Sequence, residues 1–288
     1  MPGVSQSISC GGNAANTSLG LACLGMNVSL ICRTDAFGLN LLRYFLGRNG
    51  VNLDRVKTDG KLAITAAMEF ESNHANVMIG DQGSVSNFSF DILDEPDLDL
   101  IANSDLVGVT NWTLNSCGSK LACDVFNYAS KNNTKTFLDT GDPSHRKQDI
   151  PILFNSVLTS RNLDIFGIND NELRHFNPEI SISNDEDILR SALSLKKKIN
   201  ARLDVHTSNF SATLSDNHIV VPSLRIGKIY RSTGAGDAWN AGNIFAGLLN
   251  FKDDERLFLA NTIAGLYISS EQALHPDIPR IIDFIKNI

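Results

Sequence analysis

Short apolar runs alternate with amphipathic stretches along most of the chain. The apolar runs predict strands, and the stretches between them have the spacing of helices that bury one face. Because strands that alternate with helices build a mostly parallel sheet covered on both faces, the pattern predicts an α/β fold. The expected strands are Val28–Cys32, Leu106–Thr110, Thr136–Leu138, Ile165–Ile168 and Leu203–Thr207, and the expected helices include Gly38–Arg48, Ser119–Lys131 and Asp185–Asn200.

The stretch Leu62–Phe90 breaks this alternation because it has no helical pattern. It contains three short runs, Ile64–Phe70, Asn76–Ile79 and Ser84–Phe90, which predict a small antiparallel sheet set on the larger domain. Such an insertion is either a lid over a binding site or a surface meander. We favour the lid, since long insertions in compact domains commonly carry function.

Composition narrows the classes of partner. A chain of 288 residues forms either one large α/β domain with a small appendage or two modest domains. The net charge of -7 argues against nucleic acid or an anionic membrane as the main partner. No apolar run approaches the roughly 20 residues of a membrane span, and the N-terminus lacks a signal-peptide pattern. The five cysteines include no C-x-x-C pair, so we expect reduced thiols in a cytoplasmic protein.

The most informative segment is Ser232–Gly242, in which a turn of small residues precedes an apolar helix predicted over Ala238–Leu249. The backbone N–H groups of Gly234, Ala235 and Gly236 are expected to face outward at the N-terminus of this helix. There the unpaired donors and the helix dipole favour an anion.

Asp237 lies at the rim of this turn, although a carboxylate cannot hold an anion by charge. One interpretation is a base that takes a proton from a hydroxyl while the amides stabilise a migrating phosphoryl group. The alternative is an ordinary acidic residue in a first helical turn, where the dipole favours carboxylates.

A second motif begins near the N-terminus, where Gly11 and Gly12 precede Asn13 and Asn16. The glycines allow a ligand to contact the main chain. The asparagines offer both donors and acceptors, which suits a ligand with many hydroxyl groups. In isolation, a strand-to-helix turn with asparagines at the N-cap explains this segment better than a ligand site does.

Together, and in this order, the two motifs resemble the two signatures of the PfkB carbohydrate kinases, the ribokinase-like family. The resemblance implies a three-layer fold with a mostly parallel central sheet and a small β-sheet lid, in a single domain over residues 1–288 with lid segments at about 1–10 and 62–90. It implies transfer of the terminal phosphoryl group of ATP or ADP to a hydroxyl of a sugar, a nucleoside or a related polyol. It also implies Mg²⁺ and a homodimer formed through the lid.

The resemblance assigns roles to further residues. Asn169 and Glu172 match a family motif, N-x-x-E, that acts through water on Mg²⁺ near the nucleotide phosphates. Asn111 is implied as a sugar contact by its position alone. Thr207, Thr233 and Asn261 are implied on the nucleotide side, and Asn261, within a helix expected over Asp254–Ser270, is equally well a polar residue on a helix flank. We expect His206 to be a packed residue at a strand end.

The sequence departs from the family pattern at three points. Only ten residues precede Gly11 and none is the expected aspartate. Either the given chain is truncated or mis-started, or it has lost a central strand and a substrate contact, and we expect a missing N-terminal strand. Arg231 replaces an aspartate that helps the family hold a monovalent cation, which predicts activity indifferent to K⁺ unless the arginine simply faces solvent. The segment Val205–Ser211 lacks the glycines of the nucleotide loop, which leaves open whether ATP or ADP is the donor.

These departures keep a second function open, that of a non-catalytic chain that binds a sugar or nucleoside. The missing aspartate and the altered loop favour this alternative, whereas the intact Thr233–Asp237 string favours catalysis. The identity of the sugar or nucleoside does not follow from the sequence.

Overall fold

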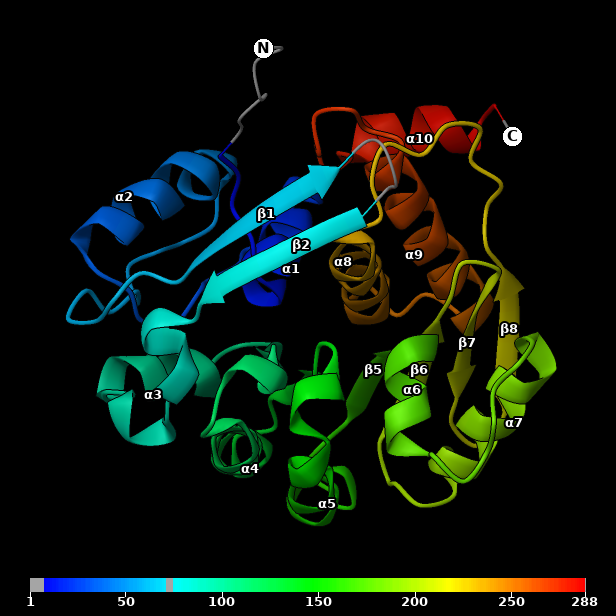
Figure 1. The fold of residues 1–288 in the computed structure, drawn as a ribbon, viewed down its shortest axis with the longest axis horizontal. Coiled ribbons are helices and arrows are strands. Elements are labelled where there is room, and N and C mark those ends of the chain that lie inside the picture. Colours follow the sequence, from blue (N-terminus) through cyan, green and yellow to red (C-terminus); the bar gives the residue numbers. More distant parts are fainter. Residues whose placement is uncertain (1–7, 71–74, 288) are drawn as a thin grey trace.

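The computed structural model describes residues 8–70 and 75–287. A six-stranded sheet has the order β3-β4-β5-β6-β7-β8, in which β3 to β6 are parallel and β7 and β8 are antiparallel (Figure 1). A separate hairpin, β1-β2, lies outside this sheet. The strands are β1 (Ile64–Phe70), β2 (Ala75–Asp81), β3 (Leu106–Thr110), β4 (Lys135–Asp139), β5 (Ile165–Asn169), β6 (Arg202–His206), β7 (Phe210–Leu214) and β8 (His218–Pro222).

Helices cover both faces of the large sheet (Figure 1). One face packs against α4 to α7 in the largest apolar cluster, and the other packs against α1, α8 and α9. The expectation of three layers around a mostly parallel sheet is therefore confirmed. The helices are α1 (Asn13–Cys23), α2 (Ala36–Phe45), α3 (Glu95–Ala102), α4 (Gly118–Lys131), α5 (Ile150–Leu153), α6 (Asp170–Phe176), α7 (Asp185–Lys196), α8 (Ala235–Leu248), α9 (Asp253–Ile268) and α10 (Ile278–Ile285).

Strand β4 shows why the central strands read as continuous apolar runs. Phe137 packs toward Ile244 of α8, whereas Leu138, its neighbour, belongs to the cluster on the opposite face. Both side chains are fully buried. A strand with helices on both faces has no solvated side, so the alternation of apolar and polar residues disappears.

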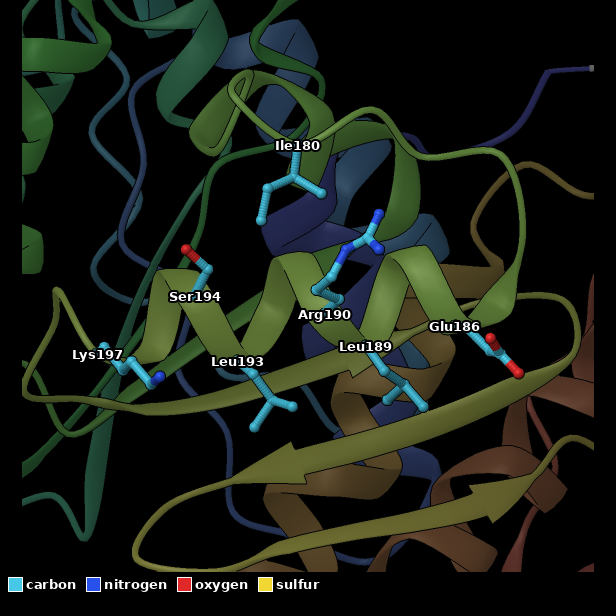
Figure 2. A pocket seen from close by; sticks show the side chains of 7 residues that line it. All are labelled: Ile180, Glu186, Leu189, Arg190, Leu193, Ser194 and Lys197. Atoms are coloured by element: carbon cyan, nitrogen blue, oxygen red, sulfur yellow. The ribbon is translucent and has the colours of Figure 1, made fainter.

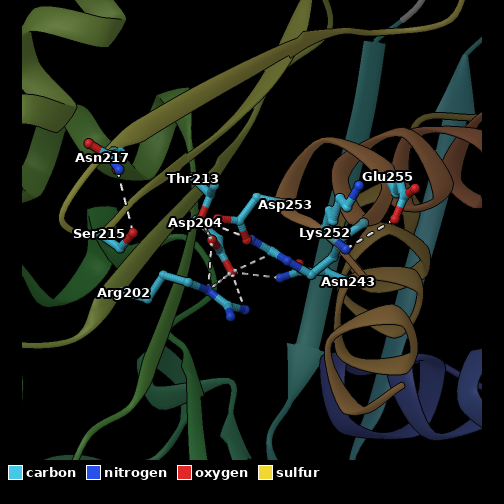
Figure 3. A network of polar contacts seen from close by, with 10 residues as sticks. Arg202, Asp204, Thr213, Ser215, Asn217, Asn243, Lys252, Asp253 and Glu255 are labelled. Carbon is cyan, nitrogen blue, oxygen red and sulfur yellow. Dashed lines mark hydrogen bonds and ion pairs between the residues drawn. The ribbon is translucent and has the colours of Figure 1, made fainter. Parts of the chain in front are cut away.

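A buried polar network fixes α8 and α9 to the sheet (Figure 3). Asp204 of β6 accepts hydrogen bonds from Arg202 and from Asn243 of α8. Arg256 of α9 lies 3.3 Å from the same carboxylate and also contacts Asn243 and Thr213. Burial alone would raise the pKa of Asp204, but the charges of Arg202 and Arg256 outweigh it and lower the pKa to about 2. Removing one partner of a buried pair typically costs about 3–5 kcal/mol, so the network holds both helices firmly.

Close packing of α8 on α9 depends on Gly242. A Cβ at this position would lie 2.9 Å from the Cα of Ala260, closer than real Cβ contacts allow. Gly242 therefore permits the close approach of the two helix backbones. At Gly247 the nearest contact would be an ordinary 3.6 Å, so this glycine does not serve packing in the same way.

The β1-β2 hairpin presents an apolar face. In its register Met68 pairs with Val77 and Ala66 pairs with Ile79, which places these side chains on one face. Met68, Val77 and Ile79 are all exposed, at 44%, 43% and 62%. The described part of the chain provides nothing that covers this face.

Two expected strands are wrong. Ser84–Phe90 instead forms two 3₁₀ turns, Gly83–Asn87 and Phe90–Ile92, beginning at a glycine with a φ of +50°. Val28–Cys32 lies beside residues 52–57, but only two isolated parallel bridges form, Ser29–Asn52 and Arg33–Lys57, because Leu53–Val56 makes a turn between them. Residues 1–7 of the expected lid segment lie outside the described residues.

The pattern also missed several short elements. These are the antiparallel strands β7 and β8 and the helices α3 and α10, each at most eight residues long. Within residues 8–70 and 75–287, no helix is both long and apolar enough to cross a membrane.

Candidate active site

Polar side chains gather where the parallel strands end. Asn111 follows β3, whereas Asp139, Asn169 and His206 are the last residues of β4, β5 and β6. The register places Thr110 opposite Asp139, and Asn169 opposite His206. The carboxyl ends of parallel strands form one edge of the sheet, which is where ligands of open α/β sheets bind.

The N-terminus of α8 carries unpaired amides at this edge. Its N-cap, Gly234, has a φ of +83°, and a Cβ there would lie 2.5 Å from the hydroxyl of Tyr267. Within the described chain, the backbone N–H groups of Gly234, Gly236 and Asp237 have no hydrogen-bond partner. The expectation that the Ala235 amide is also free is wrong, because a turn makes it donate to the carbonyl of Ser232 at 3.1 Å. The amide of Asp237 is unpaired instead, so among the described residues the free N–H groups of this turn belong to Gly234, Gly236 and Asp237.

Asp237 links the two sequence motifs. It lies in the first turn of α8 and is buried, and its Oδ2 accepts a hydrogen bond of 2.8 Å from Nδ2 of Asn16 on α1. Burial raises the pKa of Asp237 to about 7, and the nearby charge of Asp139 adds to this effect. The bond from Asn16 acts in the opposite direction because it stabilises the charged form. A carboxyl group with such a pKa can exchange a proton near neutral pH.

A second buried acid lies behind Asp237. Asp139 accepts hydrogen bonds from the amide of Gly141, at 2.8 Å, and from Nδ2 of Asn240, at 2.6 Å. Burial raises its pKa despite these two donors. Asn240 was missed by sequence reasoning, although a signal existed. It is a polar residue three positions after Asp237 in a mostly apolar helix, and so shares its face.

Glu172 forms a capping box with Asn169 at the start of α6. The amide and Nδ2 of Asn169 each donate to one carboxylate oxygen, and the Glu172 amide donates back to Oδ1 of Asn169. Burial, together with the charges of Asp139 and Asp142, raises the pKa of Glu172 well above its usual value. The end of the sheet therefore concentrates negative charge that a bound cation would relieve.

The glycine motif leaves room for a ligand. A Cβ on Gly11 or Gly12 would meet nothing within 4 Å, and Gly12 caps α1 with a φ of +93°. Asn13 and Asn111 approach each other over Gly141, since a Cβ there would lie 3.4 Å from Oδ1 of Asn111 and 3.9 Å from Nδ2 of Asn13. Two amide side chains from distant parts of the sequence thus converge beside an open backbone.

On the expected nucleotide side, two side chains are already engaged. The Thr207 hydroxyl donates to the carbonyl of Phe210 and accepts from the amides of Asn209 and Phe210, so in this conformation it has no proton for a phosphate oxygen. Asn261 accepts from Nε1 of Trp239 and donates to the backbone of β8. Thr233, in contrast, is exposed at the rim of the turn.

A hollow of about 520 Å³ lies elsewhere, over the outer face of α7 (Figure 2). Ile180 and side chains of α7, among them Leu189 and Leu193, line it. None of the residues at the ends of β3 to β6 contributes to it, so we do not regard it as the active site.

Comparison with known proteins decides the family. The model of the pfkB family of carbohydrate kinases matches residues 3–280. The chain belongs to this family. It is therefore a PfkB-type kinase, as the two motifs indicated. No curated protein sequence matches the chain.

Solved structures agree on the ribokinase-like fold. Ribokinase from Arabidopsis thaliana, complexed with ribose and ATP, superposes with a TM-score of 0.80 at 22% identity, over 99% of this chain and 93% of that chain. Adenosine kinase from Sinorhizobium meliloti superposes with a TM-score of 0.78 at 17% identity, over 96% of this chain and 82% of that chain. A ribokinase II from E. coli, described as putative and complexed with ATP and Mg²⁺, superposes with a TM-score of 0.78 at 18% identity. The superposition covers 100% of this chain and 92% of that chain.

The hydrogen bond between Asn16 and Asp237 predicts a shift in pH dependence. Replacing Asn16 by Ala removes a donor that lowers the pKa of Asp237, so the pKa should rise and less of the group should be charged at neutral pH. We expect the acidic limb of the kcat/KM profile to move by about one pH unit to higher pH. Asn13→Ala is the control, since no bond joins Asn13 to Asp237 in the structure; an unmoved limb in N16A would contradict the role of Asn16.

Proposed function

We propose that this kinase transfers the terminal phosphoryl group of ATP to a hydroxyl of a sugar, a nucleoside or a related polyol, with ADP as the alternative donor. The observation that carries the proposal is the position of Asp237. This carboxyl group, with its raised pKa, lies in the same helical turn as unpaired amides that suit a phosphoryl group.

Each group has one task in this proposal. Asp237 takes the proton of the attacking hydroxyl as the oxygen–phosphorus bond forms. The amides of Gly234, Gly236 and Asp237 stabilise the charge of the migrating phosphoryl group. The buried network that joins Asn243 of α8 to Asp204 supports this, because it ties the helix that carries the turn to the sheet.

Gly11, Gly12, Asn13, Asn16 and Asn111 are proposed to hold the acceptor. Their support is the open backbone at the two glycines and the convergence of Asn13 with Asn111. Both hydrogen-bond donors and acceptors are present, which suits a pair of neighbouring hydroxyl groups. We propose Thr233, Asn169 and Asn261 on the nucleotide side, where Asn261 acts by fixing Trp239.

The residues at the end of the sheet fit a hydrated Mg²⁺ ion. Within the described residues, no group of three or more His, Cys, Asp or Glu side chains forms a direct metal site. Glu172 and its neighbours Asp139 and Asp142 still concentrate negative charge there. We propose that they hold Mg²⁺ through water, and when bound the ion would neutralise charge on the phosphates.

We propose a homodimer in which the apolar lid face meets the same face of a second copy. The exposed Met68, Val77 and Ile79 support it, since two-stranded hairpins with such a face are marginal alone. The molecular mass in solution tests the proposal: a monomer at micromolar concentration would contradict it.

The five free thiols support a reducing location, the cytoplasm.

The direct test of function is nucleotide turnover. Release of ADP or AMP should be measured with Mg²⁺, and ATP or ADP as donor, across a panel of sugars and nucleosides. Turnover with one class of acceptor would establish both function and substrate class. Absence of turnover, together with a rise in Tm on adding an acceptor, would favour a non-catalytic binder.

Replacing Asp237 by Asn should separate catalysis from stability. We expect kcat to fall at least about 10²-fold because the base is lost. The variant should nevertheless be more stable, since a buried charge is removed while Asn can still accept from Asn16. The difference between a pKa of about 7 and the usual 3.8 bounds the gain at about 4 kcal/mol.

The sign of this stability effect depends on pH. A folded-state pKa above the unfolded value means that wild-type stability declines between about pH 4 and pH 7. The Tm advantage of D237N should therefore be larger at pH 8 than at pH 5. For catalysis, a loss of kcat below tenfold in D237N would show that Asp237 is not the base.

Arg231 predicts that activity is indifferent to K⁺. Its guanidinium donates to the carbonyl oxygens of Glu271, at 2.7 Å, and Ser270, at 3.4 Å, just beyond the end of α9. A fixed positive charge among these carbonyls would repel a monovalent cation, so the residues do not fit the cation that the family pattern implies. Equal kcat in KCl and NaCl at constant ionic strength is expected, and a large stimulation by K⁺ would contradict it.

A further inference from the structure

The imidazole of His206 lies close to Gly236, in the first turn of α8. Its Nε2 is 3.0 Å from the position that a Cβ on Gly236 would occupy, so the side chain reaches the backbone of the helical turn. On its other side, His206 pairs in register with Asn169, the residue that caps α6 with Glu172. The strand end that carries this ring is therefore next to the acidic end of β5, and the ring itself reaches the first turn of α8.

This ring is held in place by a chain of contacts. It stacks on the indole of Trp239, with the ring centroids 4.8 Å apart and an angle of 24° between the planes. Nε1 of Trp239 donates to Oδ1 of Asn261 at 2.9 Å, and Asn261 donates in turn to the carbonyl of Pro222 in β8. A side chain supported in this way is preorganised, so a contact made by Nε2 loses little conformational entropy.

The protein itself does not determine the position of the imidazole proton. Nδ1 of His206 is buried and has no hydrogen-bond partner in the described part of the chain. Burial lowers the pKa of His206 to about 4, although the charge of Asp204 opposes this, so the ring is neutral at pH 7 and carries one proton. A proton on Nε2 would lie beside Gly236, whereas a proton on Nδ1 would leave a lone pair on Nε2 at that position.

We propose that His206 donates a hydrogen bond from Nε2 to a phosphate oxygen of the nucleotide, beside the amides of Gly234 and Gly236. The role extends the proposed kinase function and rests on it. It also explains how a chain without the usual glycines, and with the Thr207 hydroxyl engaged in its own turn, can still contact the nucleotide phosphates. His206 neither accepts nor delivers a proton in this role.

Three substitutions separate the donor from the ring. Gln places its amide nitrogen near the position of Nε2, Asn reaches only as far as Nδ1, and Phe keeps the stacking on Trp239 without a donor. We expect His206→Gln to bind MgADP within about threefold of wild type by calorimetry. His206→Asn and His206→Phe should each bind about tenfold more weakly, as expected on losing a hydrogen bond to a charged group.

A control variant and a second measurement distinguish the loss of a hydrogen bond from a folding defect. His218→Phe changes an exposed histidine of β8 and should leave MgADP affinity unchanged. In a long-range ¹H–¹⁵N spectrum of the wild-type MgADP complex, the ring of His206 should be neutral with its proton on Nε2. A proton on Nδ1 in the complex would overturn the proposal.

The remaining outcomes are also decisive. If Phe binds MgADP as tightly as wild type, no hydrogen bond is made and the proposal is wrong. If Gln loses as much affinity as Phe and Asn, the ring acts by packing, which also overturns it. If the wild-type protein binds neither MgADP nor MgATP, both this inference and the kinase proposal are wrong. If the wild-type protein and every variant bind MgADP equally well, only the role of His206 is wrong.

Discussion

The site depends on burying carboxylates where no basic side chain neutralises them. Within the described chain, neither Asp237, Asp139 nor Glu172 forms an ion pair with Lys or Arg. Their negative charges are opposed only by neutral donors, namely asparagine amides and backbone N–H groups. Without a bound cation, such a cluster favours the protonated form of its carboxyl groups. A metal–nucleotide complex would offset their negative charge.

Asp204 shows the opposite solution within the same sheet. It is as deeply buried as Asp139, but Arg202 and Arg256 surround it, and its pKa falls rather than rises. The difference in partners gives two identical side chains different tasks. Asp204 ties α8 and α9 to the sheet and so supports the turn that carries Asp237, whereas Asp139 raises the pKa of Asp237 from behind.

Side chains near the expected nucleotide position are of two kinds: some are hydrogen-bonded within the protein, and one has an unpaired atom that could contact a ligand. Thr207 closes a turn, and Asn261 fixes the indole of Trp239, so neither is free in this structure. His206 stacks on Trp239 and has an unpaired ring nitrogen. Sequence position alone cannot separate these cases, because a hydroxyl or amide that is already bonded looks the same as a free one until its neighbours are known.

Local sequence determined the layered α/β plan and the motifs that carry the chemistry. Apolar runs such as Ile165–Ile168 and small residues such as Gly234 act through nearby backbone geometry, which a sequence displays directly. Tertiary structure alone decided that Asn16 reaches Asp237 across 221 positions and that Asn240 binds Asp139. It also decided that residues 28–32 form no strand. These outcomes depend on partners that only folding brings together, and the pKa of a carboxyl group depends on the same partners.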